Sequence, residues 1–284
     1  MSSCKAIRFK LFVRPDMIED REIMGFPDAS KLIGKKVSLS WRKVDLYALA
    51  FQCLGNDPQN GKIFRDHIKM AHGLLWERDS ANTAWMLPQP IRIDEEMQKK
   101  IFHSMTGPHM ASGPSGHKRG FPYTWLANHL ADGREQVSPR SFNAALRAAA
   151  EYDQNIPIGW RYPLHFRGLY NGVQRASAIR VDEVTEDFPW VEDVMQPLRQ
   201  LVVPCSASEF LSRWKREKTA DKIRNKKSAD KLPPQHVDEG PNGLLEDLQS
   251  LDIIQRLSDD RIQMPDVYRI AFGLGRRGGV KPVK

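Results

Sequence analysis

The sequence predicts a mainly α-helical protein with small β elements. Apolar residues recur at helical spacing from about Val44 to Leu54. Ser138-Pro139 combines a preferred N-cap residue with a proline suited to the first helical position. Alternating apolar and polar residues are confined to short segments near the two ends of the chain, so we expect few strands and no large sheet.

The first 60 residues predict two strands and a helix. Lys5–Arg14 alternates and then becomes apolar, as a half-buried strand does, and Pro15 ends it. A second short strand is expected at Lys36–Trp41. It leads into the helix from Val44 to Leu54, whose apolar face comprises Leu46, Leu49, Ala50 and Cys53.

The middle of the chain predicts further helices. Candidates are Ile91–Thr106, Pro122–Leu130 and the helix that starts at Ser138-Pro139 and continues to Ala149. His103–Gly120 is rich in Gly, Ser, Pro and His and is expected to be a mobile loop. Residues 156–205 give weaker signals, with a short helix expected at Trp190–Leu198.

The segment after Cys205 begins with a predicted basic helix. Ser206 is its expected N-cap, Glu209 completes a capping box, and the helix continues to about Lys227. Phe210, Leu211 and Trp214 form its apolar face. The prolines and glycines that follow predict a linker.

The last segment predicts a helix followed by a two-stranded ribbon. Leu244, Leu245, Leu248 and Leu251 fit one helical face. Ile253–Leu257 and Arg261–Tyr268 are the expected strands, and Pro265 suggests that the second strand lies at a sheet edge. Such an ending is typical of a winged-helix domain. The glycine-rich basic tail Gly273–Lys284 is expected to be extended or disordered.

Composition indicates a basic protein of the cytoplasm. Its 284 residues are 40% hydrophobic and carry a formal charge of +8, which favours polyanionic partners. No apolar run approaches the roughly 20 residues that cross a bilayer, and no secretory signal is evident. The three cysteines lie far apart, which suits a reducing compartment.

The sequence contains no complete catalytic motif. The string closest to a phosphate-binding loop, Gly113–Arg119, has the wrong spacing and lacks a hydroxyl residue after its lysine. The eight histidines and three cysteines never fall at the common metal-ligand spacings. We therefore predict no catalytic residue and no metal site, and we leave enzymatic activity open. A hydrolase with an unfamiliar site around His103–His117 depends on residue types alone.

Three features, taken in order, resemble a STAND-type P-loop ATPase. Phe12-Val13-Arg14 is similar to a strand that ends in a sensor arginine, and Gly120-Phe121-Pro122 is similar to the GxP motif of that class. The winged-helix ending follows, and the strings Pro265–Arg269 and Gly275–Val280 look like the ending of a bacterial group of these ATPases.

The resemblance implies a domain organisation. Residues 1–60 would be the rear part of a nucleotide-binding α/β layer, and residues 61–155 a helical lid. Residues 156–205 would be a connecting helical region, followed by a winged-helix domain with a basic tail at 206–284. The phosphate-binding loop and the Walker B acids would lie before Met1. The resemblance therefore implies ATP with Mg²⁺ only if an upstream half or subunit supplies them.

The resemblance also implies roles for four residues. Arg14 would report a γ-phosphate, Pro122 would contact adenine with Gly120 allowing close approach, and Arg140 would be a second phosphate sensor. Each role also has a simple structural alternative. Arg14 would be a surface arginine, Gly120 and Pro122 would mark a helix start, and Arg140 would be a solvated arginine in the first turn of its helix.

The basic stretch from Arg213 to Lys231 holds nine Lys or Arg residues against three Asp or Glu. Such clusters neutralise phosphates, although most charge runs are solvated helix faces. The candidate nucleic-acid contacts are Arg213, Lys215, Arg216, Lys218, Lys222, Arg224, Arg261, Arg276 and Arg277.

Two functions remain open from the sequence. In the first, the chain is the C-terminal part of a nucleotide-dependent switch ATPase, unable to hydrolyse ATP alone, that couples nucleotide state to a partner or to DNA. In the second, it is a stand-alone winged-helix protein that binds duplex DNA.

Overall fold

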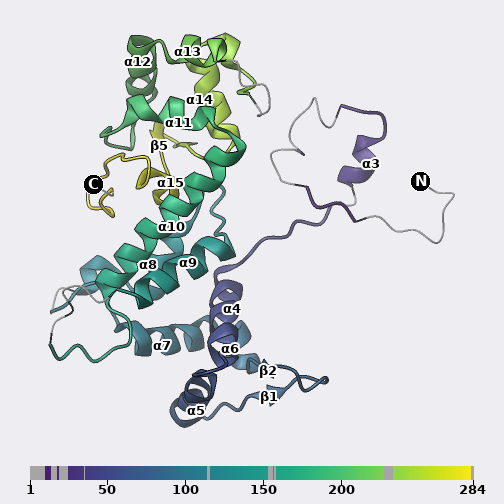
Figure 1. Ribbon diagram of the computed structural model, residues 1–284, viewed down its shortest axis with the longest axis vertical. Coiled ribbons are helices and arrows are strands. Elements are labelled where there is room, and N and C mark those ends of the chain that lie inside the picture. The colour runs from purple at the N-terminus through teal and green to yellow at the C-terminus, as the bar shows by residue number, and fades with distance from the viewer. Residues whose placement is uncertain are drawn as a thin grey trace. The chain divides into compact units, whose positions relative to one another are not determined.

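The computed structural model describes residues 10–13, 18, 25–34, 36–113, 116–152, 156, 158–226 and 233–282. The chain divides into two units, residues 1–40 and residues 41–284. The first unit contains the short helix α3 (Ala29–Ile33). The second unit holds the elements given below. They form a mainly helical fold with two small sheets, which confirms the fold class predicted from the sequence (Figure 1).

The first half of the second unit is helical apart from one hairpin. Its elements are α4 (Lys43–Gly55), α5 (Gly61–His72), β1 (Glu77–Arg78), β2 (Trp85–Met86), α6 (Gln89–Ile93), α7 (Glu95–Thr106), the 3₁₀ turn η1 (Gly116–Arg119), α8 (Pro122–Leu130) and α9 (Pro139–Ala150). They share one hydrophobic core with the start of the next helix, α10 (Phe166–Asp187).

Stacked aromatic rings form the centre of this first core. The ring of Tyr47 on α4 stacks on Tyr123 of α8 with centroids 4.0 Å apart, and Phe102 and Phe142 pack edge-on against it. Both phenols are satisfied: Tyr47 donates to the carbonyl oxygen of Tyr123 at 2.7 Å, and Tyr123 donates to Gln98 at 2.7 Å. Four helices are thereby packed around one aromatic cluster.

The second half surrounds a separate core. Its elements are α11 (Trp190–Met195), η2 (Gln196–Leu198), β3 (Cys205–Ser206), α12 (Ala207–Glu217), α13 (Thr219–Asn225), η3 (Val237–Glu239), α14 (Pro241–Ser250), β4 (Gln255–Arg256), β5 (Arg261–Gln263) and α15 (Asp266–Arg269). The three strands are antiparallel in the order β3-β5-β4. Trp214 is fully buried in this core and donates its indole N–H to the carbonyl oxygen of Val194 at 2.8 Å.

Helix α10 connects the two cores. Leu169 and Val173 are buried in the first core, and Val181 and Val184 pack against the second. The first half of α10 lies against α8 and α9, and its last turns lie beside α11 (Figure 1). A single 22-residue helix thus belongs to both cores.

Several predicted elements are confirmed. The helices expected at 44–54, 122–130 and 138–149 correspond to α4, α8 and α9, and Trp190–Leu198 is helical as α11 and η2. The two strands and the turn of the C-terminal ribbon are also present as β4 and β5. The strands are shorter than predicted, because β5 ends at Gln263 and Asp266–Arg269 is the helix α15.

The predicted N-terminal strands are wrong where the structure describes them. Residues 10–13 and 36–41 have no strand, and Val37 and Leu39 are 79% and 76% exposed. Alternation predicts a strand only if a neighbouring strand takes its backbone hydrogen bonds, and the described residues supply none. The remainder of Lys5–Arg14 lies outside the described residues, so the α/β layer stays a prediction.

Four other details of the predicted helices need correction. The expected helix at 91–106 is two helices, α6 and α7, because Asp94 caps a new helix by accepting the N–H of Glu96. The expected helix at 206–227 breaks at Lys218, which has left-handed backbone angles. Ser206 is the N-cap residue of α12, as predicted, but its hydroxyl pairs with that of Ser208 and makes no capping hydrogen bond. The exposed side chain of Cys53 shows that the buried face of α4 is shifted by one residue, to Leu46, Tyr47, Ala50 and Phe51.

The C-terminal segment differs most from expectation. Strand β5 pairs with both β3 and β4, so it is central in its sheet and not at an edge. Pro265 lies after the strand, as the N-cap residue of α15, and therefore removes no hydrogen bond from the sheet. The tail predicted to be extended or disordered is packed: Leu274 and Val280 are buried, and Gly275 bridges Val202. No helix in the described residues is both long enough and apolar enough to span a bilayer.

Candidate functional site

A cavity of the second unit has a volume of about 770 Å³, within the range of small-molecule sites. Four segments surround it: the start of α4, the end of α8 with the loop after it, the ribbon β4–β5, and the C-terminal tail. The lining residues are Trp41, Lys43, Leu46, Ala127, Asn128, His129, Ala131, Asp132, Glu135, Val137, Gln255, Gln263, Pro265, Asp266, Arg276, Arg277, Gly278 and Gly279.

The local sequence explains why these segments meet here. Helix α8 ends at Leu130, and the carboxylate of Asp132 then accepts the backbone N–H groups of Arg134 and Gln136, each at 3.0 Å, which folds the loop into a tight turn. On the ribbon, Gln255 and Gln263 are cross-strand partners. The side-chain amide of Gln255 donates to the carbonyl oxygen of Gly133, which connects the ribbon to this loop.

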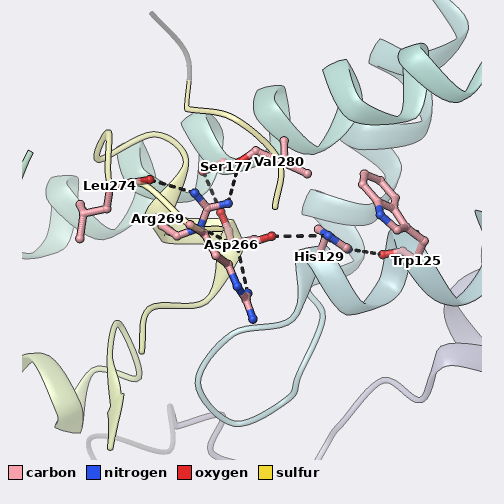
Figure 2. A network of polar contacts seen from close by, with 8 residues as sticks. Trp125, His129, Ser177, Asp266, Arg269, Leu274 and Val280 are labelled. Carbon is pink, nitrogen blue, oxygen red and sulfur yellow. Dashed lines mark hydrogen bonds and ion pairs between the residues drawn. The ribbon is translucent and has the colours of Figure 1, made fainter. Parts of the chain in front are cut away.

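Asp266 is the centre of a polar network beside the cavity (Figure 2). Its Oδ1 atom accepts Nε of Arg269 at 2.7 Å and a guanidinium nitrogen of Arg276 at 3.3 Å. Arg269 is completely buried, and its other two nitrogens donate to the carbonyl oxygens of Leu274 and Val280 at 2.8 and 2.7 Å. One guanidinium therefore organises the whole turn from α15 into the tail.

The same network reaches the helices of the first core. The hydroxyl of Ser177 on α10 accepts the N–H of Ala271 at 3.0 Å and lies 3.5 Å from the carbonyl oxygen of Asp266. Nε2 of His129 on α8 lies 3.6 Å from Oδ2 of Asp266. The C-terminal segment is thus joined to α8 by His129 and to α10 by Ser177 (Figure 2).

His129 is held from behind by its own helix. Its Nδ1 lies 2.8 Å from the carbonyl oxygen of Trp125, and its ring stacks on the indole of that residue at 4.0 Å. Burial lowers the pKa of His129, and this effect outweighs the opposing influence of Asp266. We therefore take its ring as neutral near pH 7.

The cavity wall carries both signs of charge, and most of the charges have partners. Lys43 pairs with Glu95 at 2.7 Å, and Arg276 pairs with Asp266 at 3.3 Å. Among the described residues, no carboxylate partner is found for Arg277, which is exposed. A bound anion would therefore find Arg277 available without breaking an existing ion pair.

Three of the predicted nucleotide contacts lie away from this cavity, and Arg14 lies outside the described residues. Gly120 and Pro122 are at the start of α8, about 12 Å along the helix axis from its end at the cavity. Pro122 is buried at the first turn, and Gly120 has a positive φ of 99°. Arg140 pairs with Glu183 of α10 at 2.6 Å and so connects α9 to α10.

The predicted nucleic-acid contacts fall into two groups. Arg276 and Arg277 line the cavity. The others lie on α12, α13 and the ribbon, where most have protein partners. Arg213 donates to the carbonyl oxygens of Pro197 and Arg199. The other paired residues form ion pairs: Arg216 and Lys222 with Glu217, Arg224 with Asp221 and Asp238, and Arg261 with Asp259.

Two cations of this set, Lys215 and Lys218, are exposed and have no carboxylate partner in the described part of the chain. Helix α14, by contrast, has no Lys or Arg at all, and its charged residues are Glu246 and Asp247. The cationic surface therefore lies on α12 and α13.

Two histidines of the predicted loop lie beside the ring of Phe121, and a third lies beside one of them. His103 and His109 lie 6.4 and 5.5 Å from Phe121, and His109 lies 6.3 Å from His117, measured between ring centroids. Burial lowers the pKa of His103. Ser115 lies outside the described residues, and within the described ranges no group of three metal-ligating side chains was found.

Sequence reasoning missed the residues that define the cavity, in particular His129, Asp132 and Asp266. A usable signal was present: Asp266 and Arg269 are opposite charges three residues apart in an otherwise apolar stretch, which is a common spacing for a pair within one helical turn.

Comparisons with protein-family models, with curated proteins and with solved structures gave no match for this chain.

Proposed function

We propose that this chain is the helical lid and winged-helix part of a nucleotide-dependent switch, which couples the nucleotide state of a P-loop ATPase to a partner. The observation that carries the proposal is the cavity at the meeting point of the two cores, where Asp266 links the C-terminal segment to α8 and α10. A ligand bound there would contact elements of both cores, so its binding energy could favour one arrangement of them over another.

The order of elements around the second core supports the winged-helix part of the proposal. A helix (α11) is followed by a strand, by helices α12 to α14, and by a ribbon whose returning strand β5 lies between β3 and β4. This order is similar to that of a winged helix, with the turn 257–260 as the wing.

The size and the lining of the cavity support a nucleotide as the ligand. About 770 Å³ is sufficient for a ligand of this size. Trp41 offers an aromatic surface for a base, and Arg277 and Gly278–Gly279 offer a guanidinium and open backbone for phosphates. In this proposal the phosphate-binding loop and the Mg²⁺-binding acids come from another polypeptide segment or subunit, and this chain contributes no catalytic group.

Hydrogen exchange on the native assembly tests the proposal. The chain is purified from its source cells together with the polypeptides that remain bound to it, and exchange is followed without nucleotide, with ADP and with ATP–Mg²⁺. We expect ADP and ATP to give different protection in residues 127–137 and 273–282. Equal exchange in all three samples would contradict a switch function.

Binding to duplex DNA is the second candidate function. The observation that favours it is the pair of exposed cations on and after α12, Lys215 and Lys218, beside Arg216 and Lys222. Because α14 presents no cation, such binding would use phosphates and carry little base specificity.

A salt titration separates this candidate from the first. Phosphate contacts release counterions, so the affinity of the chain for a random duplex should fall steeply with salt. The double variant Lys215→Gln with Lys218→Gln should reduce both the affinity and its salt dependence. An affinity that is undetectable at low salt, or unaffected by the double variant, would exclude this use of the surface.

A further inference from the structure

We propose that the cavity selects a ligand that places an N–H donor between Nε2 of His129 and Oδ2 of Asp266. Within the proposed nucleotide switch, on which this inference rests, the selected ligand is an adenine nucleotide and the rejected one is a guanine nucleotide.

The first step is that His129 presents an acceptor to the cavity. The carbonyl oxygen of Trp125, 2.8 Å from Nδ1, has no proton to give, so Nδ1 must carry the hydrogen of this bond. A neutral imidazole has one N–H only. Its Nε2 therefore carries a lone pair and faces Asp266.

The second step is that Asp266 presents an acceptor as well. Arg269 and Arg276 both donate to Oδ1, so the carboxyl group acts as a hydrogen-bond acceptor toward both. Among the described residues, none donates a hydrogen bond to Oδ2. Nε2 of His129 lies 3.6 Å from Oδ2 (Figure 2).

Two acceptors that face each other at 3.6 Å cannot hydrogen-bond without a proton between them. A proton on His129 would supply one, but burial, Arg276 and Arg269 together lower the pKa of this ring by more than Asp266 and the carbonyl oxygen of Trp125 raise it. The other charged groups on the cavity wall are Asp132, Glu135, Lys43 and Arg277. An amino group of a ligand, with two hydrogens, can instead donate to both acceptors at once.

This pair of acceptors distinguishes the two purines. Adenine carries an amino group at C6, and guanine carries a carbonyl oxygen there, which would bring a third acceptor to a site that needs a donor. Sites built around a specific hydrogen bond reject analogues that leave their buried polar groups unpaired. We expect adenosine diphosphate to bind at least about 10-fold more tightly than guanosine diphosphate or the diphosphate of purine riboside, which lacks the amino group.

The test is a competition series on the native assembly. Labelled ADP is displaced by unlabelled ADP, by GDP and by purine-riboside diphosphate. The same series is run on His129→Gln, because a glutamine amide can both donate and accept. This variant should bring the ADP and GDP affinities to within about threefold of each other. Asn171→Ala, at an exposed position on α10 that does not line the cavity, is the control and should keep the wild-type discrimination.

The outcomes separate this inference from the function beneath it. If GDP and ADP compete equally in the wild type, this inference is wrong and the nucleotide switch stands. If the wild type discriminates and folded His129→Gln discriminates equally well, another group reads the base and the inference is again wrong. If labelled ADP does not bind at all, the proposed function fails together with the inference. Equal affinities of the wild type for ADP and purine-riboside diphosphate would contradict the inference even if His129→Gln fails to fold.

Discussion

Asp266 and Arg269 form an ion pair whose side chains are 3% and 0% exposed, with 2.7 Å between Oδ1 and Nε. Removing two charges from water is costly, and the pair is sustained by further hydrogen bonds to each partner. Arg276 supports the carboxylate, and the carbonyl oxygens of Leu274 and Val280 support the guanidinium. The fold of the C-terminal segment therefore depends on one buried arginine.

The first prediction is that Arg269→Met is strongly destabilising. It would leave the two carbonyl oxygens without their donor and leave Asp266 with Arg276 as its remaining cation. Breaking a buried pair by removing one partner costs about 3–5 kcal/mol. Urea unfolding followed by tryptophan fluorescence measures the change.

The control for this variant is Arg261→Met. Arg261 pairs with Asp259 at the surface, with side chains 50% and 52% exposed. Exposed ion pairs contribute little, so the unfolding midpoint should not move measurably. Equal loss of stability in Arg261→Met and Arg269→Met would contradict the role assigned to the buried pair.

The second prediction concerns the contact between α9 and α10. A Cβ atom at Gly172 would lie 2.2 Å from the carbonyl oxygen of Ala145, and one at Gly168 would lie 2.7 Å from that of Ala149. The two glycines allow the helix backbones to approach closely. Gly172→Ala should therefore force the helices apart and cost about 1–3 kcal/mol, although alanine is the better helix former.

Asn171→Ala is the matched variant for this test, because Asn171 is exposed on the same turn of α10. It should be neutral or slightly stabilising in thermal unfolding. A stabilised Gly172→Ala would show that helix propensity, and not close packing, governs this position.

These glycines also show why α10 was missed from the sequence. The helix contains Gly168 and Gly172, which lower its intrinsic propensity, and its buried face changes from one core to the other along its length. A single apolar stripe is therefore absent. Helices α8 and α9 were predicted within one residue at each end, because proline at the first turn and one continuous apolar face mark them locally.

The candidate site was less predictable for a related reason. His129 precedes Gln255 by 126 residues and Asp266 by 137, so no local spacing brings it to them. The motifs read from the sequence, Gly120–Pro122 and the basic run, are local patterns. In the structure, Pro122 starts a helix and is buried, and Arg224 of the basic run pairs with Asp221. The same local patterns therefore have a structural explanation.

The third prediction is a pH dependence from His236. Its Nδ1 lies 2.7 Å from Oδ1 of the buried Asp247, and this hydrogen bond raises the pKa of His236 above its ordinary value of 6.5. Because the folded-state pKa is the higher one, the stabilisation is fully present below pH 6.5 and is lost as the pH rises through the raised pKa. His236→Gln should therefore be less stable than the wild type at pH 5.5, by roughly 1 kcal/mol, and should approach it at high pH.

Unfolding of both proteins at a series of pH values checks this prediction. The difference between them should shrink on the alkaline side of pH 6.5. A difference that is constant with pH would mean that packing of the ring, and not its charge, makes the contribution.

The last prediction concerns Arg277 and the orientation of the proposed nucleotide. Arg277 lines the cavity, and no carboxylate among the described residues neutralises it, so its charge is available to a phosphate. A hydrogen bond between a guanidinium and a phosphate is charge-assisted, and its loss in Arg277→Gln should weaken ADP binding about 10-fold. Because the side chain is exposed, the unfolding midpoint should stay unchanged.

Lys215→Gln is the control: it removes an equal charge from α12, away from the cavity lining, and should leave ADP binding intact. Competition binding on the native assembly measures both variants. If the two lose affinity equally, the effect is one of overall charge, and the phosphates do not lie at Arg277.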